Sequence, residues 1–77
     1  SPLGPYRQEW TKVAEEILEN SKTPLANTQI LQKLRQQGIE LEGNAIQKIN
    51  EFIKKPYLSP LAKKKCFKRK RGFGDTK

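Results

Sequence analysis

The sequence predicts a small, mainly α-helical domain, and three observations support this fold class. Three segments carry apolar residues at the three-to-four-residue spacing that marks one face of a helix. Prolines and glycines separate these segments at short intervals. The chain has 77 residues, which is near the lower limit for a self-sufficient core. Because a single amphipathic helix is unstable in water, the three apolar faces must pack against one another.

The first helix is predicted over residues 7–20. Its apolar side chains follow the i, i+3, i+4, i+7, i+8 series of one face: Trp10, Val13, Ala14, Ile17 and Leu18. Glutamates and Lys12 occupy the positions between them and face solvent. Pro24 prevents the helix from continuing, because proline lacks the amide hydrogen that a helix interior needs.

The second helix is predicted in the segment "NTQILQKLRQQG", where Ile30, Leu31 and Leu34 share a face. Asn27 or Thr28 caps its start, and Gly38 is a natural C-terminal stop. The connection from the first helix is short, so these two helices pack side by side or at an angle.

The third helix is predicted in "NAIQKINEFIKK", after a connection that contains "IELEG". The alternation in this connection indicates either a short strand or an extended connector. Gly43 or Asn44 opens the helix, and Pro56 ends it. Its apolar positions are Ala45, Ile46, Ile49, Phe52 and Ile53. Trp10 and Phe52 both lie on apolar faces, so we interpret them as core residues rather than exposed stacking platforms.

Residue composition argues against an enzyme. The sequence has one cysteine, Cys66, and no histidine, which excludes an internal disulfide, a zinc cluster and histidine acid–base chemistry. It contains neither a glycine-rich phosphate loop nor a nucleophile–base pair. We therefore expect no catalytic residue, no metal and no cofactor. A free thiol fits the cytosol or nucleus, and no apolar run approaches membrane-spanning length.

Positive charge is concentrated at one end of the chain. Residues 1–53 hold six Lys/Arg and seven Asp/Glu, whereas residues 54–77 hold ten Lys/Arg and only Asp75. A nearly neutral part joined to a cationic end indicates a polyanionic partner, and nucleic acid is the commonest one. The alternative interpretation of "KKKCFKRKR" is a nuclear-import signal or a solubilising tail.

The helical part resembles the HARE-HTH domain, a winged helix-turn-helix module of additional-sex-combs-like chromatin proteins that also occurs, in a distant form, in a bacterial RNA polymerase delta subunit. The match runs over residues 10–55, and its main signature is Trp, then Ala, then I-L-E-N, T-P, Q-I-L and Gly. In this chain those positions are Trp10, Ala14, Ile17, Leu18, Glu19, Asn20, Thr23, Pro24, Gln29, Ile30, Leu31, Gln32 and Gly38. Ala26 stands where the family tends to have a capping Thr or Ser, so the cap is expected to move to Asn27.

The resemblance implies a three-helix winged helix-turn-helix over residues 6–73, with a short basic β-hairpin wing or tail at its C-terminal end. Residues 1–5 are then an unstructured start or a cloning remnant, and residues 74–77 are a tail. Only "CFKRKRGFGD" can supply the wing, with Phe67 as its inward aromatic and Gly72 and Gly74 as turn formers. Cys66 is either a small apolar residue of the wing strand or a thiol whose pKa is lowered by flanking cations.

In such folds the third helix enters the major groove, where Asn and Gln can pair with adenine edges and Lys with guanine or phosphate. Glu51 on this face would repel phosphate. The predicted DNA-binding residues lie on this helix, on the basic wing and on the lysines before it: Asn44, Gln47, Lys48, Lys54, Lys55, Lys63, Lys64, Lys65, Lys68, Arg69, Lys70 and Arg71.

We therefore expect a monomeric, nuclear module of a chromatin or transcription regulator that binds double-stranded DNA. Its other expected partners are proteins of a chromatin complex, and no membrane partner is expected. A second hypothesis is a protein-docking module with a basic import tail. RNA binding is a third, since Tyr57, Phe67 and Phe73 could stack on bases.

Overall fold

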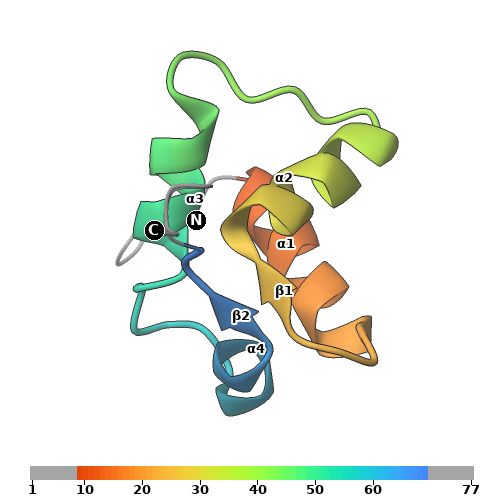
Figure 1. Ribbon diagram of the computed structural model, residues 1–77, viewed down its shortest axis with the longest axis vertical. Helices are drawn as coiled ribbons and strands as arrows, with labels where there is room; N and C mark the ends of the chain where they lie inside the picture. Colours follow the sequence, from red (N-terminus) through yellow and green to blue (C-terminus); the bar gives the residue numbers. More distant parts are fainter. Residues whose placement is uncertain (1–8, 70–77) are drawn as a thin grey trace, which may run out of the picture.

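The computed structural model describes residues 9–69. Within this range the elements follow in the order α1 (Glu9–Asn20), β1 (Leu25–Ala26), α2 (Asn27–Gln36), α3 (Ala45–Phe52), α4 (Pro60–Lys64) and β2 (Cys66–Phe67) (Figure 1). The mainly α-helical class is therefore confirmed, and each of the three predicted helices is present. The described residues contain a fourth helix, α4, that we did not predict.

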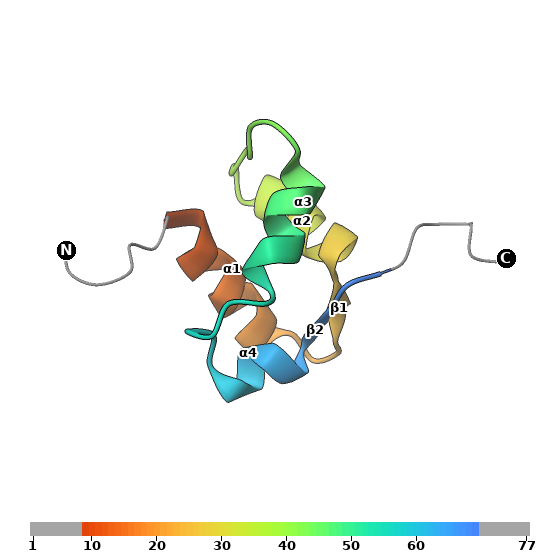
Figure 2. The same ribbon diagram turned by 90° about the vertical axis from the view of Figure 1, so that its left-hand side faces the viewer.

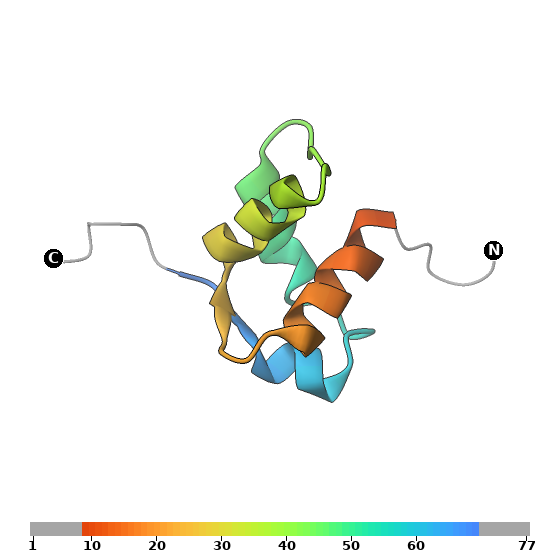
Figure 3. The same ribbon diagram turned by 90° about the vertical axis from the view of Figure 1, so that its right-hand side faces the viewer.

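Helix α2 occupies the middle of the helical arrangement, since it packs against both α1 and α3. Helix α4 packs on α1, near the lower end of α1 in the view of Figure 3. The buried core is built from the predicted apolar faces together with Leu25, Leu58 and Ala62 from the connecting parts. The largest fully buried side chains are Phe52, Leu18, Ile30, Leu34 and Ile49.

The two aromatic residues assigned to the core behave as predicted. Phe52 is 1% exposed, and Trp10 is half-buried and packs against the core cluster. Their ring centroids lie 5.4 Å apart with an interplanar angle of 59°, a tilted arrangement that aromatic rings favour. This pair joins the first turn of α1 to the last turn of α3.

The start of α2 differs from the prediction, whereas its end agrees. Its N-cap is Ala26, so the prediction that Asn27 or Thr28 caps the helix is wrong. The Gln29 side chain supplies the cap instead, because its Oε1 accepts a hydrogen bond from the Ala26 amide at 2.9 Å. At the other end Gly38 has φ +85°, the left-handed conformation that favours glycine. The Ile39 amide then donates to the Leu34 carbonyl at 3.0 Å, which closes the helix.

Helix α3 begins as predicted and ends earlier. Asn44 is its N-cap, and its Oδ1 accepts from the Gln47 amide at 3.1 Å. The helix ends at Phe52, ahead of Pro56, and the amides of Lys54 and Lys55 then bond to carbonyls three residues back, which tightens the last turn. The preceding connection around Ile39 and Leu41 is not a strand, so "IELEG" is the extended connector of the two alternatives.

The start of helix α4 is marked in the sequence by a serine followed by a proline. Ser59 is its N-cap and Pro60 its first residue, the arrangement in which proline is best tolerated. The Ser59 Oγ accepts from the Ala62 amide at 3.2 Å and donates to the Glu19 carboxylate at 2.6 Å. The Ser59 amide donates to the Glu15 carboxylate at 2.9 Å. Two acidic residues of α1 therefore hold the start of α4 in place.

The two short strands form a parallel pair, in which Leu25 lies opposite Cys66 and Ala26 opposite Phe67 (Figure 2). The predicted strand at Cys66–Phe67 is therefore present, but its partner in the described chain is β1. The return half of the predicted hairpin, with Gly72 and Gly74, lies outside the described residues. Phe67 is 47% exposed, so its assignment as the inward aromatic of the wing is wrong. Cys66, which precedes it, packs against the core instead, as alternation along a strand requires.

Candidate nucleic-acid interface

The outer face of α3 and the residues after it carry the predicted polar side chains, and all of them are exposed: Asn44, Gln47, Lys48, Glu51, Lys54 and Lys55. Burial of Ile49 and Phe52 in the core fixes which face of the helix is outward. This part of the sequence-based site is present as an accessible surface.

A chain of side-chain contacts runs along this face. The Asn44 Nδ2 donates to the Gln47 Oε1 at 3.4 Å, and the Gln47 Nε2 donates to the Glu51 carboxylate at 3.5 Å. These distances are at the long end of hydrogen bonding, so the contacts are weak. They nevertheless give Gln47 a neighbour at each end of its amide. One amide hydrogen and one carbonyl lone pair of Gln47 stay available to pair with a base edge.

The cationic end of the chain meets α3 at a buried polar junction, made of Asn27, Asn50 and the Arg69 backbone. Asn27 is 2% exposed. Its Nδ2 donates to the Asn50 Oδ1 at 2.6 Å, and its Oδ1 accepts from the amides of Thr28 at 2.8 Å and Arg69 at 3.2 Å. One side chain at the start of α2 thus links α3 to the backbone that follows β2.

This junction distinguishes the two sides of α3. Gln47 precedes Asn50 by three residues, so the two side chains are neighbours on the helix surface. Lys48 precedes Asn50 by two residues and therefore lies on nearly the opposite side of α3. Helix geometry thus puts Gln47 on the side of α3 that carries Asn50 and the junction, and Lys48 on the other side.

The cluster of three lysines does not lead directly into a wing strand. Lys63 and Lys64 form the last turn of α4, and Lys65 is its C-cap. The Lys63 Nζ donates to the Ile53 carbonyl at 3.2 Å, and the Lys65 Nζ donates to the Ser21 carbonyl at 2.5 Å. These two ammonium groups satisfy carbonyls just beyond the ends of α3 and α1, a common task for lysine near helix ends. Each of these two predicted DNA-binding lysines thus also has a hydrogen-bond partner within the fold.

The remaining predicted cations of the described chain after α3 are exposed: Lys54, Lys55, Lys64, Lys68 and Arg69. Lys70 and Arg71 lie outside the described residues. The candidate interface consequently comprises Gln47 on α3, the exposed lysines that follow α3, and Lys68 and Arg69 after β2. We call Lys68 and Arg69 the cationic segment.

Cys66 does not have the environment of a reactive thiolate. Burial raises the pKa of its thiol above the ordinary value, and the positive charge of Lys63 lowers the pKa by less. The Cys66 Sγ also lies 3.7 Å from the Lys63 carbonyl oxygen. The hypothesis that flanking cations lower this pKa is therefore wrong, and the structural interpretation of Cys66 as a small residue of the strand is favoured.

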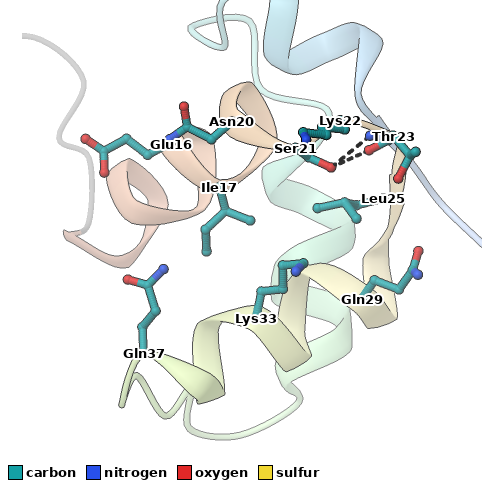
Figure 4. Close-up of a pocket in the computed structure, with 10 residues that line it drawn as sticks. All are labelled: Glu16, Ile17, Asn20, Ser21, Lys22, Thr23, Leu25, Gln29, Lys33 and Gln37. Atoms are coloured by element: carbon teal, nitrogen blue, oxygen red, sulfur yellow. Dashed lines mark hydrogen bonds between the residues drawn. The ribbon is translucent and has the colours of Figure 1, made fainter.

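A separate open groove lies between the C-terminal end of α1 and the side of α2 (Figure 4). Its lining is mixed, with Ile17 and Leu25 at its floor and polar residues such as Lys22, Lys33 and Gln37 around it. No residue of α3, α4 or β2 lines it. The groove is thus distinct from the candidate interface, and its two lysines are suitable control positions.

The sequence does not predict the two residues that join the interface together, Asn27 and Asn50. It indicates Asn27 only as a helix cap, and no pattern marks Asn50. In the sequence, Asn27 directly follows the apolar residues Leu25 and Ala26, and Asn50 directly follows Ile49. Their pairing depends on the angle between α2 and α3, which no local pattern specifies.

Among residues 9–69, no group of acidic, histidine or cysteine side chains is arranged to hold a metal ion. No helix in that range is long and apolar enough to cross a membrane. Comparisons of the chain with protein-family models, curated proteins and solved structures found no match. The resemblance to HARE-HTH domains therefore stays a prediction.

Proposed function

We propose that this protein is a non-catalytic module that binds double-stranded DNA, with the outer face of α3 directed to the major groove and the cationic segment on phosphates. The observation that carries the proposal is the Asn27 junction. It holds the Arg69 backbone against the helix that bears Gln47. A sequence-sensitive DNA interface needs a helix that contacts base edges and a phosphate-binding segment held in a fixed position relative to it.

Charge supports the same conclusion. Residues 54–69 contain seven Lys/Arg and no Asp or Glu, so this stretch attracts a polyanion over its whole length. We further propose that the fold is a winged helix-turn-helix of the HARE-HTH type and that the parent protein is a nuclear chromatin or transcription regulator. The prediction of Lys70 and Arg71 as phosphate contacts is retained in this proposal.

A protein-docking module is the second candidate, and Glu51 favours it. This carboxylate is exposed in the middle of the outer face of α3 and would repel phosphate unless it accepts a hydrogen bond from a cytosine amino group. In that alternative the cationic segment serves nuclear import only.

Charge reversal of the cationic segment separates the two candidates. We expect Lys68→Glu/Arg69→Glu to weaken binding of a labelled 15-base-pair duplex, measured by fluorescence anisotropy at several salt concentrations. If each residue neutralises one phosphate, the slope of log K against log salt falls by about 2 in magnitude. Binding to duplexes of different sequence weakens to a similar extent, because phosphate contacts carry no sequence information.

The matched control is Lys22→Glu/Lys33→Glu, which makes the same change in net charge at the groove of Figure 4. This variant is expected to keep the salt slope of the unaltered protein. If both double variants lose affinity for DNA and salt dependence to the same extent, DNA binding depends only on the net charge of the domain, and the proposed interface is wrong. If the unaltered protein does not bind duplex DNA at low salt, the docking alternative is favoured.

A further inference from the structure

The exposed ring of Phe67 is a feature that duplex binding alone does not explain. Phe67 and Leu61 are the only large hydrophobic side chains of residues 9–69 that are exposed, each at 47%. Burial of an aromatic ring contributes a large part of a small domain's stability. About half of Phe67 is left accessible to solvent, whereas the preceding residue, Cys66, packs against the core.

The backbone around Phe67 is held on both sides. The residue pairs with Ala26 of β1 in the parallel sheet, and two residues later the Arg69 amide donates to Asn27. The Leu25 amide also donates to the Lys65 carbonyl at 2.8 Å, just ahead of the strand. A ligand that contacts the ring does not have to order this segment first, so little binding energy is lost to conformational entropy.

The charges next to the ring indicate what kind of ligand fits it. Lys68 and Arg69 follow Phe67 directly, and no acidic residue occurs between residues 54 and 69. An apolar protein surface would have to bury these cations with the ring, which is unfavourable without paired acidic groups. A nucleic-acid strand satisfies both features, because its phosphates pair with the cations and its bases stack on the aromatic face.

We propose that Phe67 is a stacking site for an unpaired base, so that the interface binds a duplex with a single-stranded extension more tightly than a blunt duplex. Bases within an intact duplex have both faces covered by their neighbours, whereas a base in an extension offers a free face. This inference rests on the proposed DNA-binding function and names the form of DNA that the same interface prefers.

The test compares two labelled ligands by fluorescence anisotropy: a blunt 12-base-pair duplex and the same duplex with a four-nucleotide extension at either the 5′ or the 3′ end. The unaltered protein is expected to bind one of the extended duplexes about 5- to 100-fold more tightly than the blunt one, the range that base–aromatic stacking supplies. Phe67→Ala is expected to abolish this preference while affinity for the blunt duplex stays the same.

Two further variants separate stacking from general hydrophobic contact. Phe67→Leu keeps an apolar side chain without an aromatic face and is expected to lose the preference, whereas Phe67→Trp is expected to keep it. Circular dichroism of all three variants should match that of the unaltered protein, because the ring is not in the core. Retention of the preference in Phe67→Leu, or loss of it in Phe67→Trp with unchanged folding, overturns the stacking site.

The outcomes also distinguish this inference from the proposed function. If the unaltered protein binds blunt and extended duplexes equally, and Phe67→Ala changes neither affinity, the stacking site is wrong while duplex binding stands. If Phe67→Ala weakens both ligands by the same factor, Phe67 is an ordinary duplex contact and the inference is again wrong. If the unaltered protein binds neither ligand, the inference and the proposed function fail together.

Discussion

Replacing Phe52 with alanine is expected to cost about 3–5 kcal/mol of folding free energy, the usual range for removing a buried phenylalanine from a core. The side chain is 1% exposed and contacts Trp10 across the space between α3 and α1. A domain of this length has about 4–12 kcal/mol in total. The variant is therefore expected to lose a large fraction of the domain's stability, seen as a large fall in the urea midpoint measured by circular dichroism.

The control for this prediction is Leu61→Ala. Leu61 is also apolar but is 47% exposed on α4, so its replacement should change the free energy of unfolding by no more than about 0.5 kcal/mol. Equal effects of the two substitutions would contradict the core described above, because they would mean that the α3–α1 contact contributes no more than an exposed side chain.

The second large effect is expected at the buried junction. Asn27→Ala removes the partner of the Asn50 side chain and of the Thr28 and Arg69 amides. These hydrogen bonds are part-buried, and each bond of this kind contributes about 0.5–1.5 kcal/mol to stability. We also expect the variant to bind duplex DNA more weakly, because the cationic segment loses its attachment to α3. Urea unfolding measures the first effect and anisotropy the second.

A double-mutant cycle with Asn50→Ala tests whether this loss comes from the junction. Contacting residues show coupling energies of about 0.5–3 kcal/mol, whereas independent sites show values near zero. Gln32→Ala, at an exposed position of the same helix, is the control and should change stability by less than about 0.5 kcal/mol. Additive effects of Asn27→Ala and Asn50→Ala would show that the two side chains do not act together.

The sequence allowed the three main helices and most of their buried positions to be predicted. Ile30, Leu34, Ile49 and Phe52 followed from periodicity alone, because one apolar face per helix must be buried somewhere. Gly38 and Asn44 followed from local chemistry, since a left-handed residue and a side-chain acceptor mark helix ends in any fold. These predictions need only interactions between residues that are close together in the sequence.

Other features depend on tertiary placement. The Gln29 cap of α2 replaced the expected Asn27 cap because Asn27 points to Asn50 and to the Arg69 backbone instead. Helix α4 is short, and its position is fixed by Glu15 and Glu19 on α1, which precede its N-cap Ser59 by 44 and 40 residues. The outward direction of Phe67 follows from the pairing of β2 with β1, which periodicity could not predict for a two-residue strand.

The candidate site was predicted only in outline for the same reason. All α3 positions proposed for base contact are exposed, as expected from the helix face. The sequence does not show which lysines bond to the fold and which are available to phosphate. Lysines of both kinds lie next to one another in the chain, so their sequence surroundings are the same. Only the contacts of Lys63 with Ile53 and of Lys65 with Ser21 distinguish them from Lys64.

A backbone NMR titration with a short DNA duplex tests most directly whether α3 and the cationic segment form one binding surface. We expect the amides of Gln47, Lys68 and Arg69 to shift together and saturate with a single dissociation constant, while those of Lys22 and Lys33 in the separate groove stay unchanged. Shifts of Lys68 and Arg69 that do not saturate, with unchanged α3 amides, would contradict a shared surface and leave only nonspecific attraction to the chain's cationic end.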